Sequence, residues 1–318
     1  MRYRSFLADS GRWEGFALRP GDIIISTPPK CGTTWAQMIC ALLIFQAPPP
    51  TPPFDRPLDL TSPWLEMLTR PRADVLADLE AQTHRRFIKS HTPLDGLPAG
   101  DGVTYLSVGR DPRDAAVSMR HHLGNLDMNN FFAAWSATVA ADGVTDIPPP
   151  PAPTSGPEWL LGWIDTTSPL QEAPNTLAGA VHHLGSFWAA RHRGDVVLLH
   201  YDDLRGDLEG EMRRLADRLG IEVPDGRWPT LVEAATFAAM RLRADVVAPD
   251  THEHLWKSNA EFFHRGTSGQ WRDTFDAEVL ARYEARLAEL APPDLAHWLH
   301  SGGSPASPEA HEGAPLSS

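Results

Sequence analysis

The sequence predicts an α/β fold in which helices flank a central parallel sheet. Two short runs are almost entirely apolar, Asp22–Ser26 (DIIIS) and Val196–Tyr201 (VVLLHY), as in parallel strands that are covered on both faces. Helix-like stretches alternate with strand-like runs along the chain, and this alternation is typical of layered α/β proteins with right-handed crossovers. In such folds, ligands bind at the carboxyl ends of the strands.

The expected elements follow one another in a regular order. They are strand Asp22–Ser26, helix Thr34–Gln46, strands Arg86–Lys89 (RFIK) and Val103–Val108 (VTYLSV), helix Pro112–His122, strand Val196–Tyr201 and helix Leu208–Leu219. The first helix is amphipathic and directly follows a loop. The second has its own start signal, because Asp111 is suited to the N-cap and Pro112 to the first helical position.

Length and composition predict one large globular domain. The chain has 318 residues, of which 42% are hydrophobic, so folding should bury roughly three quarters of the unfolded surface. We expect a single domain over residues 1–300, with a lid or acceptor loop over 141–175, where periodicity is unclear. Proline clusters at Ala47–Pro57 and Pro148–Pro157 favour stiff surface loops over a partner-binding polyproline segment. Residues 301–318 are expected to form a disordered tail.

The charge and the cysteines exclude several classes of protein. A formal net charge of −13 makes the chain a poor general binder of nucleic acid, although a local cationic cleft is compatible with it. Cys31 and Cys40 are too few for a disulfide framework or a zinc site of four thiolates. The N-terminus lacks the apolar region of a signal peptide, and the run Met38–Phe45 is too short to cross a bilayer. We therefore expect a cytoplasmic protein without stable membrane association; homodimer formation is left open.

The most informative segment is Ile23–Trp35, IIISTPPKCGTTW. A buried strand leads through a Pro-Pro turn into Lys30 and Gly32 and then into a helix. Helix N-termini have unpaired N–H groups and partial positive charge, so they attract phosphate. The glycine lets the backbone approach an anion, and the lysine and the hydroxyls of Thr33 and Thr34 supply charge and donors. The lysine precedes the glycine, so this is not the loop G-x-x-x-x-G-K-[ST] of nucleoside-triphosphate-binding proteins.

The segment resembles the 5′-phosphosulfate loop of cytosolic-type sulfotransferases, which use 3′-phosphoadenosine 5′-phosphosulfate (PAPS). The resemblance implies the sulfotransferase architecture, which is related to that of P-loop kinases, and PAPS as the co-substrate, with no metal. It also implies that the loop binds the cofactor through Lys30, Cys31, Gly32, Thr33, Thr34 and Trp35. Two residues depart from the family pattern: a proline stands where tyrosine is usual before Pro29, and Cys31 replaces serine or threonine.

A second motif, Tyr105–His121 (YLSVGRDPRDAAVSMRH), lies at the end of a predicted strand. An arginine at that end can fork onto a phosphate, and a serine in the following helix can share it. The motif resembles the family's 3′-phosphate site, and the matching residues are Arg110 and Ser118. Family precedent also suggests that this serine restrains the loop lysine until the acceptor arrives.

Between the two motifs, RFIKSHTPL resembles the strand that carries the family's catalytic base, here His91. An imidazole with an ordinary pKa near 6.5 can take the proton of an attacking hydroxyl at neutral pH. Lys89, on the same face of the strand, is expected to stabilise charge on the sulfuryl group.

Three later segments resemble the family's remaining cofactor contacts. VVLLHYDDL matches the segment whose tyrosine approaches the adenine, and LVEAATFAAM is a weaker match in which Ala235 replaces a threonine. FFHRGTSGQWRDTF resembles the closing glycine-rich motif, with histidine in place of arginine at position 264. The residues implied to bind the cofactor are Tyr201, Thr236, Phe237, His264, Arg265 and Gly266. These matches lie in the family's order between about Asp22 and Phe275.

The sequence therefore predicts sulfuryl transfer from PAPS to a hydroxyl or amine of a small, apolar acceptor. One alternative is a P-loop-type kinase, in which Asp202 or Asp203 would bind magnesium, although an N-cap role is favoured for them. The other is a non-catalytic nucleotide-binding protein on the same scaffold. His182-His183 and His252-Glu253-His254 lack metal-site spacing and are expected on the surface.

The acceptor itself is not determined by the sequence. Aromatic residues around Asn130–Trp135 and Trp159–Trp163 fit an apolar acceptor pocket and an ordinary core equally well.

Overall fold

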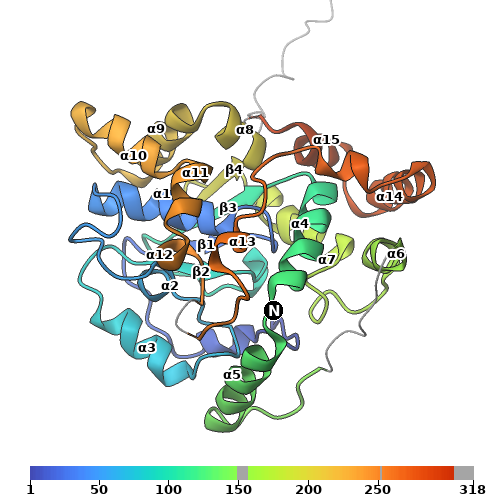
Figure 1. Ribbon diagram of the computed structural model, residues 1–318, viewed down its shortest axis with the longest axis horizontal. Coiled ribbons are helices and arrows are strands. Elements are labelled where there is room, and N and C mark those ends of the chain that lie inside the picture. The colour runs from blue at the N-terminus through green and yellow to red at the C-terminus, as the bar shows by residue number, and fades with distance from the viewer. Residues whose placement is uncertain (149–156, 251–252, 304–318) are drawn as a thin grey trace, which may run out of the picture.

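The fold is known from a computed structural model that describes residues 1–148, 157–250 and 253–303. Its centre is a four-stranded parallel sheet in the order β2-β1-β3-β4, formed by β1 (Ile23–Ser26), β2 (Phe87–Ser90), β3 (Thr104–Gly109) and β4 (Val196–His200). In the register of the sheet, Ile24 of β1 lies opposite Ile88 of β2 and Tyr105 of β3. The α/β architecture expected from the alternating pattern is confirmed (Figure 1).

Alternate strand residues enter two separate hydrophobic clusters, one on each face of the sheet. Ile23 and Ile25 of β1 face a cluster built with α1, α9 and α10, whereas Ile24 faces a cluster built with α7, α14 and α15. This two-sided burial explains why the strand reads as a continuous apolar run.

The helices and short 3₁₀ turns connect the strands and cover the sheet. The helices are α1 (Thr33–Phe45), α2 (Leu58–Thr61), α3 (Arg72–Ala81), α4 (Pro112–Asn125), α5 (Met128–Ala141), α6 (Pro157–Asp165), α7 (Leu177–Ala189), α8 (Tyr201–Gly206), α9 (Leu208–Leu219), α10 (Trp228–Ala234), α11 (Phe237–Leu242), α12 (Ala244–Val247), α13 (Asn259–Phe262), α14 (Ala277–Leu290) and α15 (Pro293–Ser301). The 3₁₀ turns are η1 (Ser10–Trp13), η2 (Leu94–Gly96), η3 (Asp225–Arg227) and η4 (Gln270–Asp273). No helix in the described ranges is both long and apolar enough to span a bilayer.

Helix boundaries follow local capping chemistry. Asp111 accepts a hydrogen bond from the backbone N–H of Arg113 and Pro112 is the first residue of α4, as the sequence predicts. Tyr201 was expected to end a strand, but it begins α8 instead, because the side chain of His200 caps that helix. The predicted N-cap role of Asp202 and Asp203 is therefore wrong: both lie in the first turn.

The stretch 141–175, expected to hold a lid or acceptor loop, contains α6, and Trp163 of that helix is buried in a cluster with residues of α7 and α14. The role of the stretch stays a prediction. One further expectation needs correction. His183 is not a surface residue: it is buried and its Nε2 lies 2.9 Å from Ser26 Oγ. Most of the proline cluster Pro148–Pro157, His252, and the tail beyond residue 303 lie outside the described residues.

Candidate active site

The loop between β1 and α1 forms a tight turn at the carboxyl end of the sheet. Lys30 and Gly32 both have left-handed backbones, with φ angles of 67° and 104°. A β-carbon at Gly32 would lie 3.2 Å from Cδ2 of Tyr201, so only glycine fits here without a shift. The hydroxyls of Thr27 and Thr33 are 2.6 Å apart and join the two ends of the turn. The N-terminus of a 13-residue helix thus opens onto a rigid backbone cradle.

The ammonium of Lys30 lies in a largely aromatic environment. Its Nζ is 3.1 Å from Nδ1 of His122 and 4.6 Å from the centre of the Phe262 ring. Desolvation lowers the pKa of Lys30 to about 7, with Arg110 and Lys89 adding to the effect. The lysine therefore loses its charge easily unless an anion lies beside it.

Arg110 joins this loop to a distant segment of the chain. Its Nη1 donates to the carbonyl oxygen of Lys30 at 2.9 Å, and its Nη2 donates to that of Thr267 at 3.2 Å. The guanidinium also lies 4.1 Å from the centre of the Tyr201 ring. The side chain is 5% exposed, and within the described residues its Nε has no hydrogen-bond partner. A buried guanidinium with a free donor suits a phosphate group.

His91 follows β2, and the loop after β1 engages one of its two ring nitrogens. Its Nδ1 lies 2.7 Å from the carbonyl oxygen of Thr27, so Nδ1 carries the proton and Nε2 is left as the acceptor. Desolvation, with the nearby ammonium of Lys89, lowers the pKa of His91 to about 3. This is far below the ordinary value near 6.5. It keeps the imidazole neutral at pH 7, with Nε2 unprotonated, and it also makes that nitrogen a weaker base than a free histidine.

Trp64 lines two pockets, one of which contains His91 and the other Lys89. Its ring meets that of His91 edge-on at 4.6 Å, and Nζ of Lys89 lies 4.6 Å from its centre. A pocket open to solvent, of about 460 Å³ including the solvent at its mouth, is lined by His91, Trp64, Pro29, Tyr3, Leu7 and Pro174, among others. The other, of about 420 Å³ measured in the same way, is lined by Lys89, Trp64, Gln37, Asp59, Thr69 and Val247, among others. Neither is lined by residues 130–135 or 159–163, so those aromatic segments are not part of either cavity.

The residues expected near the adenine form a connected group. The ring of Trp35 meets that of Tyr201 edge-on at 5.3 Å, and its Nε1 donates to the carbonyl oxygen of Ala235 at 2.8 Å. The next residue, Thr236, caps α11, and Phe237 begins that helix. Phe237 packs against Gly266, where a β-carbon would approach its ring to 2.4 Å.

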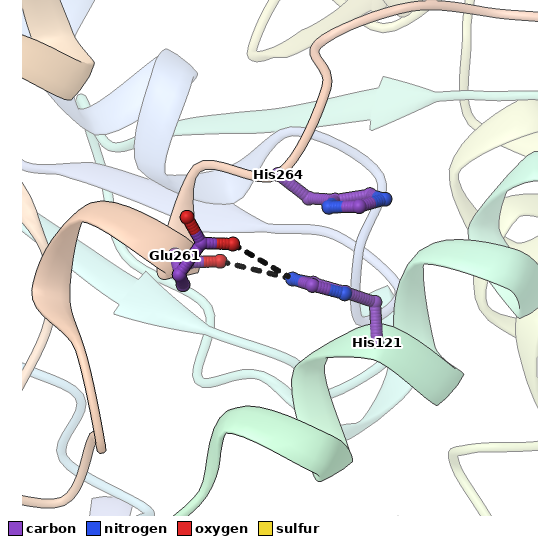
Figure 2. A group of neighbouring side chains, drawn as sticks. All are labelled: His121, Glu261 and His264. Atoms are coloured by element: carbon purple, nitrogen blue, oxygen red, sulfur yellow. Dashed lines mark hydrogen bonds and ion pairs between the residues drawn. The ribbon is translucent and has the colours of Figure 1, made fainter.

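His264 lies against α4, which also carries Ser118. Figure 2 shows its ring stacked on that of His121, with centres 3.6 Å apart. Nε2 of His121 lies 3.2 Å from the carbonyl oxygen of Glu261 and 3.9 Å from its carboxylate. Arg265, the next residue, is exposed.

Two groups of side chains bring three potential metal-binding atoms within 4.8 Å of one another. The first is the group of Figure 2, and the second comprises Asp59, Asp250 and Glu253. Arg241 binds the carboxylate of Glu261 at 3.0 Å in the first group, and Arg70 lies 3.5 Å from that of Glu253 in the second. Because like charges repel, these cations oppose the binding of a metal ion, and we assign no metal to either group.

Comparison with known proteins identifies the family. Residues 20–291 match the model of the sulfotransferase domain. The chain belongs to the sulfotransferase family. It is 44% identical over 315 residues to a glycolipid sulfotransferase of Mycobacterium bovis (strain BCG / Pasteur 1173P2), covering 94% of each chain. A glycolipid sulfotransferase of Mycobacterium tuberculosis (strain ATCC 25618 / H37Rv) is 43% identical, again over 94% of each chain. Sulfotransferase 1A1 of Rattus norvegicus is 23% identical over 89% of each.

Solved structures show the same fold. Mouse sulfotransferase SULT7A1 complexed with PAP matches with a TM-score of 0.66 at 18% identity, covering 91% of this chain and 90% of that one. Retinol dehydratase in a complex with retinol and PAP matches with a TM-score of 0.62 at 22% identity, covering 89% and 86%. The match to the sulfotransferase domain and the 44% identity to a glycolipid sulfotransferase make the protein a sulfotransferase rather than a kinase. Asp202, the candidate magnesium ligand of the kinase alternative, accepts a hydrogen bond from Ser268, and Asp203 accepts one from the backbone N–H of Gly303.

Two residues of this sulfotransferase site were not found from the sequence. Glu66 is buried, and its Oε1 accepts hydrogen bonds from Trp13 and from Ser90 and Thr92, the residues on either side of His91, at 2.7, 2.5 and 2.9 Å. Burial raises the pKa of this carboxyl. No local pattern distinguishes such a glutamate from a surface one.

His122, the partner of Lys30, had a detectable signal. It lies four residues after Ser118 in a helix that the sequence predicts, and residues four apart share a helix face. A residue that shares a face with a candidate for the cofactor site is itself a candidate.

Proposed function

We propose that this sulfotransferase moves the sulfuryl group of PAPS to a hydroxyl of a glycolipid, with His91 as general base. One observation carries the proposal: a single loop contacts both the base and the arginine of the 3′-phosphate site. His91 contacts the carbonyl oxygen of Thr27 and Arg110 that of Lys30, three residues later. A donor bound along this loop would have its sulfated end near the base.

The proposed step is an in-line displacement at sulfur. The acceptor oxygen forms a bond to sulfur, while the bond from sulfur to the bridging phosphate oxygen breaks and PAP leaves. The proton of the hydroxyl passes to Nε2 of His91, which is available because Nδ1 is engaged. Lys30 and the N–H groups at the start of α1 offset charge on the departing oxygen. The donor is held at its 3′-phosphate by Arg110, with Ser118 and Gly266 in support.

A glycolipid acceptor is supported by the relatives and by the cavity at His91. Both mycobacterial relatives, at 43–44% identity, are named glycolipid sulfotransferases. The cavity that contains His91 is lined by apolar Leu7 and Pro174 and by polar Arg4 and Gln171, as a ligand with a lipid and a sugar part requires. The cytoplasm stays our proposed compartment, because the cysteines of the chain, Cys31 and Cys40, are free thiols.

The test is transfer of labelled sulfate from PAPS to a panel of glycolipids, sterols and phenols. We expect a glycolipid product, and we expect His91→Ala to lower turnover by about two to four orders of magnitude while PAP still binds. His192→Ala, at an exposed histidine, is the matched control. Turnover that survives in His91→Ala would remove the base from the mechanism, and labelling confined to phenols would contradict the acceptor class.

A further inference from the structure

The side chain of Lys30 has one hydrogen-bond partner among the described residues, and that partner is His122. The Nζ–Nδ1 distance is 3.1 Å, and the face of Phe262 covers the ammonium from another side at 4.6 Å. An ammonium has three N–H donors and no acceptor, so Nδ1 of His122 must accept. Its proton is therefore on Nε2, the opposite tautomer to that of His91.

The ring of His122 is held in place from two directions. It packs against Trp256 at 4.7 Å and Phe262 at 5.6 Å between ring centres. The end of α4 is also tied to the segment that carries Trp256, since Asp127 N–H donates to Leu255 and Lys257 N–H to the carbonyl oxygen of Asn125, both at 2.8 Å. Because packing holds the His122 ring in one position, its hydrogen bond can hold the side chain of Lys30 in one position as well.

The charges around the pair make this contact important for Lys30. The titratable groups that act electrostatically on the lysine and the histidine are cationic or neutral at pH 7: Arg110, Lys89, Cys31, His91 and His121. Desolvation holds the pKa of His122 well below its ordinary value, so it is neutral at pH 7. A neutral acceptor favours the charged form of the lysine, whereas the neighbouring cations disfavour it.

We propose that His122 is a positioning residue for sulfuryl transfer: its Nδ1 accepts a hydrogen bond from Lys30, which orients that side chain at the phosphosulfate loop and favours its charged form. The contact between Nζ of Lys30 and Nδ1 of His122 is a feature of the structure and does not depend on the proposed function. Its part in catalysis rests on the proposed function, because that function gives Lys30 its task.

The chain allows a direct test, because it contains only three lysines, Lys30, Lys89 and Lys257. Protein labelled with ¹³C at lysine Cε is titrated by NMR, and Lys30→Arg assigns the signal of interest. His122→Phe removes the acceptor but keeps an aromatic ring in the space, so water does not replace the imidazole. We expect the proton affinity of Lys30 to fall by about tenfold or more, as loss of a hydrogen bond to a charged group implies.

Matched controls separate this effect from a general disturbance. His122→Asn places its Oδ1 near the position of Nδ1 and should restore the lysine titration, whereas His122→Gln carries its oxygen one bond farther and should not. Lys257 is exposed and donates to the carbonyl oxygen of Gly124, so its titration should be the same in every variant. If His122→Phe does not fold, the comparison of Asn with Gln decides the question.

Activity supplies the second measurement. His122→Phe should lower kcat by about tenfold to a hundredfold while the Kd for PAP changes little, and His122→Asn should recover most of the loss. An unchanged Lys30 titration in a folded His122→Phe protein would overturn the proposal, as would Asn and Gln variants that behave alike. A wild-type protein that transfers no sulfate from PAPS would instead overturn the proposed function and leave the lysine titration standing.

Discussion

Arg110→Ala should remove most of the preference of this enzyme for a nucleotide with a 3′-phosphate. The guanidinium is buried, stacks on Tyr201 and has one nitrogen without a partner among the described residues. Its other two nitrogens bond to the carbonyl oxygens of Lys30 and Thr267. In the variant, a bound 3′-phosphate would lose its nearest full positive charge in a poorly hydrated site.

The size of the effect follows from the burial of this group. Truncation of one partner of a buried, hydrogen-bonded charge pair costs about 2–5 kcal/mol, which is about 30- to 5,000-fold in Kd. Adenosine 5′-phosphate has no 3′-phosphate, so its affinity should change only through the lost support of the loop at Lys30. The ratio of the two Kd values therefore measures how much Arg110 contributes to binding of the 3′-phosphate.

The assay is calorimetric titration of PAP and adenosine 5′-phosphate into the wild type and Arg110→Ala. We expect the preference for PAP to fall by about 30-fold or more. Arg120→Ala, at an exposed arginine of α4, is the control and should keep the preference. Equal weakening of both nucleotides would refute the argument, because it would mean that Arg110 only supports the loop.

Three further results are expected. Because the pKa of His91 is lowered to about 3 and that of Lys30 to about 7, kcat/KM for PAPS should be level between about pH 5 and 6 and should fall as the pH rises through 7. An acid limb near 6.5 that His91→Ala abolishes would contradict this. Gly266→Ala should cost about 1–3 kcal/mol of stability and weaken PAP binding, because its β-carbon would meet a phenylalanine ring at 2.4 Å. In thermal melts, Gly124→Ala should lose nothing, since within the described residues a β-carbon there would meet no atom within 4 Å outside its own turn of α4. Glu66→Ala should lower the free energy of unfolding by about 3 kcal/mol or more, because it leaves three buried donors without an acceptor. Glu66→Gln keeps one oxygen and should lose less, as measured by urea unfolding. Equal losses in the two variants would show that the three donors do not depend on this oxygen.

The parts of the site that the sequence predicts are those fixed by local chemistry. The strand, turn and helix at Ile23–Trp35 are set within 13 residues by an apolar run, two prolines and a glycine that must adopt a positive φ angle. The start of α4 is equally local, because Asp111 and Pro112 determine it. Arg110 follows from the same argument, since the residue before that cap lies at the carboxyl end of a strand.

What the sequence does not predict depends on contacts between distant segments. His122 meets Lys30 across 92 residues, and Glu66 meets Trp13 across 53. The pKa of His91 is another case, because the desolvation that lowers it comes from the packed site rather than from neighbours in sequence. Tyr201 shows the limit at an element boundary: the apolar run continues to this residue, yet the cap formed by His200 turns the chain into α8.

The same desolvation acts on His91 and Lys30 with opposite consequences for the proposed reaction. It favours the neutral form of both, which is the active form of a base but the inactive form of a group that must offset negative charge. Bound PAPS brings negative charge to the lysine and therefore raises its pKa, while His91 stays neutral because its own value starts near 3. The alkaline fall of kcat, which reports the complex, should then lie at higher pH than that of kcat/KM, which reports the free enzyme. Coincident limbs would show that the cofactor does not recharge Lys30, and the charge on the departing oxygen would have to be offset by the N–H groups of α1.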